Sequence, residues 1–266
     1  MTTKRFSIND ISRMKGKNKI VCLTAYTYPF AQIFDKYVDL LLVGDSLGMT
    51  IYGMDSTLPV SLDMMINHGK AVVKGSSQAL VVIDMPFGSY QESPAQAFRN
   101  AALILKETGC QAVKLEGGRE MAATITHLVT CGIPVMGHIG LMPQHVNEHG
   151  GYKVQGNDSK SAKKLLDDAS AIEAAGAFAI VIEGVKNKIA KDLVKKTSIP
   201  TIGIGAALEC DGQVLVCDDM TGLFTQFTPK FVKQYSNISK ELDNAAKQFS
   251  DEVRSGSFPT KDHLFL

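Results

Sequence analysis

Acidic side chains follow four of the short apolar runs in this chain. Asp45, Asp84, Glu116 and Glu183 each come within two residues of the end of such a run, and His138 ends another. In a barrel of parallel strands the loops after the strands open on one mouth, so we expect these side chains to converge there. The group could then act on a substrate as ligands, acids or bases.

Four carboxylates that converge cannot all be ionised and unpaired at neutral pH, because like charges raise one another's pKa. A divalent cation would resolve this repulsion. Oxygen ligands without histidine or thiolate partners favour Mg²⁺ or a similar hard ion, which takes one or two protein carboxylates and keeps several waters. The pattern therefore predicts a magnesium site built from these acids.

Lys114 stands two residues before Glu116, so both side chains point to the same face of an extended strand. A lysine inside a barrel needs a carboxylate or an anionic ligand nearby. Beside a metal, Lys114 would supply a fixed positive charge for a substrate carboxylate or a developing enolate.

Structural alternatives exist for each of these residues. Asp45 and Asp84 are residue types that cap turns, and Lys114 with Glu116 is compatible with an internal salt bridge. Glu183 is compatible with a water-exposed position at the rim, and a lone histidine such as His138 is often a satisfied core residue.

Two spacings put the glutamates in a common register. Glu116 comes seven residues after Gly109, and Glu183 comes seven residues after Gly176. We therefore expect both glutamates at a similar height in the barrel. The segment Gly150–Gly156 lies in the longest loop, between the fifth and sixth strands, where a substrate-covering lid is expected.

Short, continuously apolar runs predict strands that are buried on both faces, as parallel strands are. The runs are 20–23, 40–43, 79–83, 112–115, 133–136, 178–182, 201–204 and 214–216. The gaps between them have helical character at 94–109, 119–130, 159–176, 185–196 and 229–249. The first of these begins with Ser93-Pro94 and ends at Gly109, which are typical start and stop signals.

Strand–helix alternation repeated about eight times over the chain predicts a single (β/α)₈ barrel of the TIM type. We interpret residues 1–266 as one catalytic domain, with 1–19 as an N-terminal extension or helix. A doubly wound open sheet is the alternative.

Composition limits the partners and the compartment. Lys and Arg number 28 against 27 Asp and Glu, a formal charge of +1, which argues against nucleic acid or an anionic membrane as the main partner. No apolar stretch approaches the about eighteen residues that cross a bilayer, and no signal-peptide core follows the first residues. We expect a cytoplasmic protein. Five scattered cysteines without a C-x-x-C pair indicate reduced, mostly buried thiols.

Seven blocks in order resemble the ketopantoate hydroxymethyltransferase family, and the resemblance runs almost end to end. The blocks are LVGDSLGM at 42–49, DSTLPV at 55–60, DMPF at 84–87, VKLEGG at 113–118, GHIGL at 137–141, GGYKVQG at 150–156 and IGIGA at 202–206. Two departures are visible: Asp218 stands where many members have histidine, and Met54 where a polar residue is common.

This resemblance implies a Mg²⁺-dependent transferase on a (β/α)₈ barrel that assembles as a homo-oligomer, often a decamer. It implies transfer of a hydroxymethyl group from 5,10-methylenetetrahydrofolate to 3-methyl-2-oxobutanoate through a metal-stabilised enolate, giving 2-dehydropantoate for pantothenate and coenzyme A synthesis. Carried over residue by residue, the metal acids are Asp45, Asp84 and Glu116, the keto-acid contacts are Asp45, Ser46, Asp84 and Lys114, and the general base is Glu183.

Three rival functions remain open, and the first would use similar acids. One is a lyase or mutase resembling the isocitrate lyase and phosphoenolpyruvate mutase group, although no cysteine lies in the long loop between Gly140 and Ser159. A second is a metal-free aldolase in which Lys114 forms a Schiff base. The third is a non-catalytic barrel that binds a metal and a keto acid as a sensor.

Overall fold

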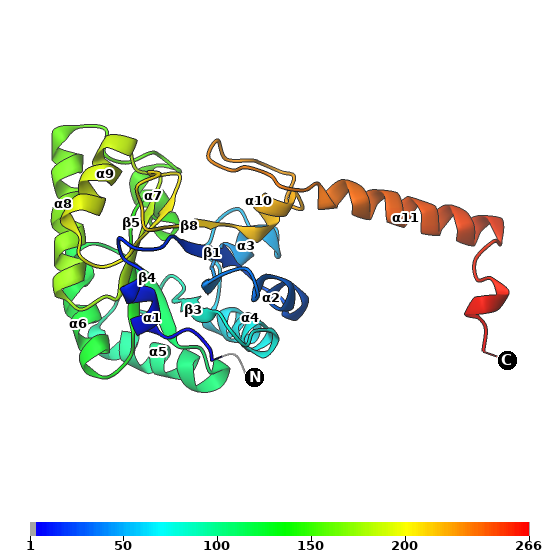
Figure 1. The fold of residues 1–266 in the computed structure, drawn as a ribbon, viewed down its shortest axis with the longest axis horizontal. Coiled ribbons are helices and arrows are strands. Elements are labelled where there is room, and N and C mark those ends of the chain that lie inside the picture. Colours follow the sequence, from blue (N-terminus) through cyan, green and yellow to red (C-terminus); the bar gives the residue numbers. More distant parts are fainter. Residues whose placement is uncertain (1–3, 266) are drawn as a thin grey trace. The chain divides into compact units, whose positions relative to one another are not determined.

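A closed barrel of eight parallel strands in chain order forms the centre of the fold (Figure 1). The computed structural model describes residues 4–265. The strands are β1 (Ile20–Thr24), β2 (Leu40–Val43), β3 (Leu80–Asp84), β4 (Ala112–Glu116), β5 (Val135–Gly140), β6 (Ala179–Glu183), β7 (Thr201–Ile204) and β8 (Gly212–Leu215). The predicted (β/α)₈ architecture is confirmed.

Helices cover the outside of the barrel, and α4, α5, α6, α8 and α9 are the main covering elements (Figure 1). The helices of the barrel unit are α1 (Ile8–Arg13), α2 (Tyr28–Phe34), α3 (Leu47–Thr50), α4 (Leu62–Gly75), α5 (Pro94–Thr108), α6 (Ala122–Thr130), α7 (Val146–His149), α8 (Ser159–Ala174) and α9 (Asn187–Lys196), with 3₁₀ turns η1 (Arg119–Met121) and η2 (Pro143–His145). The Ser93 side chain accepts the Gln96 N–H at the start of α5, and Gly109 ends it at φ +76°.

Several predicted strands and helices differ from the structure in their bounds, and α2 and α4 lie in gaps for which no helical range was given. β5 runs on to Gly140 instead of ending at Met136, because strand pairing with β6 continues through His138. The predicted helix 119–130 begins with the 3₁₀ turn η1. The predicted helix 229–249 is α11 (Ile238–Ser255): Asn237 caps its start by accepting the Lys240 N–H, and Gly256 at φ +72° ends it.

Side chains inside the barrel stack in layers of four from alternate strands, as the strand register requires. From the amino ends of the strands upward, the layers are Leu40, Ala112, Ala179 and Gly212; then Cys22, Val82, Met136 and Ile202; then Leu42, Lys114, Val181 and Val214; then Thr24, Asp84, His138 and Ile204. Glu116 and Glu183 share the layer above. The expected common height of the two glutamates is therefore confirmed.

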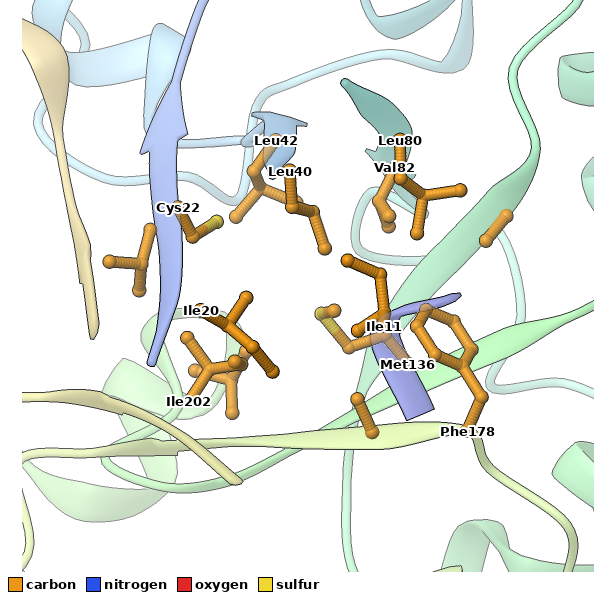
Figure 2. Packing of buried hydrophobic residues seen from close by; sticks show 14 of the residues in the cluster. Ile11, Ile20, Cys22, Leu40, Leu42, Leu80, Val82, Met136, Phe178 and Ile202 are labelled. Atoms are coloured by element: carbon orange, nitrogen blue, oxygen red, sulfur yellow. The ribbon is translucent and has the colours of Figure 1, made fainter. Parts of the chain in front are cut away.

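The lower layers are apolar and belong to one buried cluster, whose side chains point toward one another in Figure 2. Ile11 of α1 packs into this cluster, and Phe6, Ile8 and Met14 pack against it. Polar groups enter the interior only from Lys114 upward. The barrel thus provides a rigid apolar base that supports a polar mouth.

The described chain separates into two compact units, one up to Val216 with the barrel and one from Cys217 onward. The second contains α10 (Cys217–Thr221), α11 and the 3₁₀ turn η3 (Lys261–His263). The prediction of one catalytic domain over 1–266 stays a prediction.

Cys22, Cys110, Cys210 and Cys217 are buried and Cys131 is exposed, and all five are unbridged. Among residues 4–265, no helix is long and apolar enough to cross a membrane.

Candidate active site

The barrel mouth brings together the side chains that the sequence singled out. Asp84 and Glu183 are the last residues of β3 and β6, Glu116 is the last of β4, and Asp45 follows β2 by two residues. Asp45, Asp84, Lys114, Glu116 and His138 are all buried. The Glu183 side chain keeps 18% exposure, so it remains accessible from the mouth.

Asp84 links the two neighbouring strands. Its Oδ1 lies 3.0 Å from Lys114 Nζ, and its Oδ2 accepts a hydrogen bond of 3.0 Å from the backbone N–H of Asp45. Lys114 is the register partner of Asp84 across β3 and β4. Because a buried ion pair adds little to stability on average, this pair points to a role in binding or catalysis.

His138 lies between the two glutamates. Its Nδ1 is 3.5 Å from Glu116 Oε1, and its Nε2 is 3.3 Å from Glu183 Oε2. Burial and Lys114 lower the pKa of His138, but the two glutamates outweigh them and raise it to about 9. Lys114 Nζ is also 3.3 Å from Nδ1, a contact that cannot be a hydrogen bond once the ring is doubly protonated. We therefore assign His138 as the doubly protonated imidazolium, because each ring nitrogen then faces one carboxylate.

Asp45 and Asp84 hold protons more tightly than isolated acids do. Burial, followed by the charges of Asp84 and Glu116, raises the pKa of Asp45 to about 8. Burial also raises the pKa of Asp84, against the opposing effect of Lys114. Burial lowers the pKa of Lys114, but Asp84, Glu116 and Asp45 together raise it above its ordinary value. The cluster therefore takes up a proton near neutral pH unless a cation replaces that proton.

The acids fit a hard cation that keeps most of its water. Asp84 Oδ1 is buried and receives no well-directed hydrogen bond within residues 4–265, although Lys114 lies near. In the same residues, no three His, Cys, Asp or Glu side chains converge on one ion position. Mg²⁺ typically takes one or two carboxylates, so Asp45 and Asp84 suit it. Glu116 is already engaged through Oε2, which accepts the Gln144 N–H.

Ser46 lies at the same mouth. Its Oγ shares a 2.7 Å hydrogen bond with the Tyr26 hydroxyl. A Cβ at Gly44 would stand 2.8 Å from this Oγ, so the glycine allows the close approach of the chain here. Ser46 is thus held in a fixed position near Asp45.

Sequence reasoning missed Gln144 and Tyr90. Gln144 is buried in η2, and its Nε2 donates to Asp45 Oδ2 at 2.8 Å. The Tyr90 hydroxyl accepts the Glu116 N–H and donates to Gln144 Oε1. The acids of the site were predicted because each comes within two residues of the end of an apolar run. Gln144 and Tyr90 do not follow such a run, so this criterion does not identify them.

The loop between β5 and α8 reaches the mouth at both of its ends. Gln144 contacts the acids near its start, and Gln155 pairs with the backbone after Glu183 near its end. Tyr152 donates to Met49 Sδ at 3.6 Å, and its pKa is raised by partial burial and then by Asp45 and Glu183. The lid function of 150–156 stays a prediction.

The sequence matches known proteins along most of its length. Residues 5–261 match the family described as ketopantoate hydroxymethyltransferase. The chain is 56% identical to 3-methyl-2-oxobutanoate hydroxymethyltransferase of Rhodospirillum rubrum, covering 98% of this chain and 95% of the relative. The protein of the same name from Brucella canis is also 56% identical, covering 100% and 96%.

Solved structures with this fold are distant in sequence. Phosphonopyruvate hydrolase superposes with a TM-score of 0.62 at 12% identity, covering 98% of this chain and 92% of that protein. 2,3-Dimethylmalate lyase gives 0.60 at 12% identity, covering 98% and 89%. At these identities the likeness concerns the barrel alone.

Proposed function

This chain belongs to the ketopantoate hydroxymethyltransferase family and is a transferase, and we propose that it moves a hydroxymethyl group from 5,10-methylenetetrahydrofolate to 3-methyl-2-oxobutanoate with Mg²⁺ as cofactor. The observation that carries this proposal is the joint placement of Asp45, Asp84 and Lys114 beside the His138–Glu183 pair at one barrel mouth. The first group suits binding of a chelating keto acid. The second supplies a base within reach of the same ligand.

Asp45 and Asp84 would hold the metal directly, and Glu116 would act through water because Gln144 and His138 occupy its surroundings. When bound, Mg²⁺ supplies a Lewis acid that stabilises negative charge arriving on the keto oxygen. Lys114, fixed by Asp84 at 3.0 Å, adds a positive charge toward the carboxylate end of the substrate. Ser46 offers a hydroxyl that Tyr26 already orients.

Glu183 would remove the proton from C3 of the keto acid. His138 approaches one of its oxygens, Oε2, which leaves the other oxygen for the substrate. The enolate carbon then forms a bond to the methylene carbon of the folate, the two C–N bonds of that carbon break, and water supplies the hydroxyl oxygen. The proton taken by Glu183 and one proton of this water go to the two folate nitrogens. The products are 2-dehydropantoate and tetrahydrofolate.

The charge state of Lys114 argues against the Schiff-base alternative. Imine formation requires the unprotonated amine. The three carboxylates keep the pKa of Lys114 above its ordinary value, and its ammonium is paired with Asp84. We therefore assign Lys114 to fixed-charge binding.

Assembly and location rest on the family relationship. We propose a cytoplasmic homo-oligomer, with a decamer as the expected state. Light scattering on the purified protein gives the mass directly, and a monomer at micromolar concentration would contradict this assembly.

Product analysis tests the function. The protein is incubated with 3-methyl-2-oxobutanoate, 5,10-methylenetetrahydrofolate and MgCl₂, and 2-dehydropantoate is measured by mass spectrometry. Omitting the metal or using Asp84→Ala should abolish the product. Absence of product with the complete mixture, while the keto acid binds, would refute the proposal.

A further inference from the structure

Gln144 makes hydrogen bonds to two of the predicted metal acids at once. Its side-chain Nε2 donates to Asp45 Oδ2 at 2.8 Å and to the Met85 carbonyl at 3.0 Å. Its backbone N–H donates to Glu116 Oε2 at 3.0 Å. The residue is only 4% exposed, so these bonds form away from bulk water, where a lost partner is expensive.

The amide of Gln144 has one orientation. Its Oε1 accepts from the Tyr90 hydroxyl at 2.7 Å and from Gln91 Nε2 at 3.2 Å. Burial raises the pKa of Tyr90 well above its usual range, so the hydroxyl keeps the proton that it donates. Turning the amide around would place Oε1 against the carboxylate of Asp45 and leave Nε2 facing donors. The four side-chain hydrogen bonds therefore fix both the amide and the Asp45 oxygen that it holds.

Gln144 also begins the long loop between β5 and α8. It lies in η2, four residues after β5 ends at Gly140, and the loop then runs through Tyr152 and Lys153 to Asp158, which caps α8. The other end of the loop is held by backbone bonds from Gln155 N–H to Gly184 and from Lys186 N–H to Gln155. The start of the loop is thus joined to the acids by Gln144.

We propose that Gln144 is a positioning residue that turns the Asp45 and Glu116 carboxylates for a divalent cation and couples the 141–158 loop to that site. The inference has two halves. The metal half, orientation of the carboxylates for a cation, rests on the proposed function, whereas the loop half, attachment of the 141–158 loop to the acids, does not. With Oδ2 held by Gln144, Asp45 presents its other oxygen to the ion. Metal binding and ordering of the loop then strengthen each other, as two coupled events must.

The test uses Gln144→Met, which keeps the side-chain length and the backbone N–H to Glu116 but removes the amide. Mn²⁺ affinity is measured by electron paramagnetic resonance, and tryptic cleavage after the exposed Lys153 by mass spectrometry. Loss of a hydrogen bond that orients a metal ligand weakens binding about 10- to 100-fold. We expect that loss together with faster cleavage, measured at a temperature at which both proteins are folded. The unfolding temperature should fall as well, because the Met85 carbonyl and the Tyr90 hydroxyl lose a buried partner.

Gln96→Met is the matched control. The side-chain amide of Gln96 also bonds loop backbone at both ends, donating to Gly88 O at 2.8 Å and accepting from Glu92 N–H at 3.1 Å. Neither of these partners is an acid of the site. This variant should keep the wild-type Mn²⁺ affinity and cleavage rate. Wild-type values for Gln144→Met would overturn the inference.

A second comparison covers the case in which Gln144→Met does not fold. Saturating Mn²⁺ should slow cleavage after Lys153 in the wild-type protein, and no protection would overturn the coupling. If the wild type binds no Mn²⁺, the proposed function and the metal half of this inference both fail, and metal-free cleavage of the variant against the wild type decides the loop half.

Discussion

Metal affinity should depend steeply on pH because Asp45 carries a proton in the metal-free protein. Burial and the charges of Asp84 and Glu116 raise the pKa of this carboxyl to about 8, and only the deprotonated form binds a cation. Below that pKa the proton competes, so the apparent dissociation constant rises about tenfold for each pH unit. Between pH 8 and pH 6 the expected loss is roughly 50- to 100-fold.

Titration calorimetry with Mg²⁺ at pH 6, 7, 8 and 9 measures this dependence. Affinity should rise with pH and level off above about pH 8, and buffers of different ionisation enthalpy should report release of about one proton at pH 6 to 7. Asp45→Asn removes the titrating group, so its weaker residual binding should lose most of the slope. A flat affinity from pH 6 to 9 in the wild type would refute the reasoning about the carboxylate cluster.

Three further perturbations test separate parts of the site. Lys114→Met should lower kcat/KM by about 10²–10³-fold, as loss of a charge that stabilises a transition state does. Treatment of the wild-type protein with substrate and borohydride should leave no adduct on Lys114 by mass spectrometry, and a trapped adduct would support imine formation instead. Asp45→Asn should raise the unfolding temperature of the metal-free protein at pH 8. The reason is that a carboxyl whose pKa is raised in the folded state destabilises the fold increasingly as pH rises toward that pKa. A lower unfolding temperature of the variant in calorimetry would contradict the repulsion between Asp45 and the neighbouring acids. Gly118→Ala should lower the free energy of unfolding by about 1–3 kcal/mol, since the added Cβ would lie 2.2 Å from Asp168 Cγ. A free energy of unfolding in urea equal to that of the wild type would contradict this clash.

The strand ends could be predicted because two physical patterns coincide in them. Parallel strands are apolar on both faces, and the first polar side chain marks the mouth of the barrel. This is why Asp84, Glu116 and Glu183 were placed correctly at their strand ends. The same rule ended the fifth strand too early, since His138 is a polar residue inside a strand.

Residues that reach the site from loops were beyond this rule. Gln144 and Tyr90 contact the acids from segments without a regular period, and their bonds exist only once the barrel closes. The helix predicted from Pro229 has a similar origin: apolar residues such as Phe231 and Tyr235 prolong a helical spacing, but Asn237 supplies the cap that starts the actual helix. Local patterns identify the elements, and tertiary contacts decide their ends and their partners.

Proton removal from C3 of 3-methyl-2-oxobutanoate by Glu183 is the central step of the proposed reaction, and hydrogen exchange in deuterated buffer measures it most directly. With Mg²⁺ and no folate, NMR should show the wild type exchanging the C3 proton. Glu183→Gln keeps the shape of the side chain and should bind Mg²⁺ and the keto acid nearly normally, while exchanging about 10²–10⁴-fold more slowly. Exchange at the wild-type rate in this variant would contradict the assignment of Glu183 as the base.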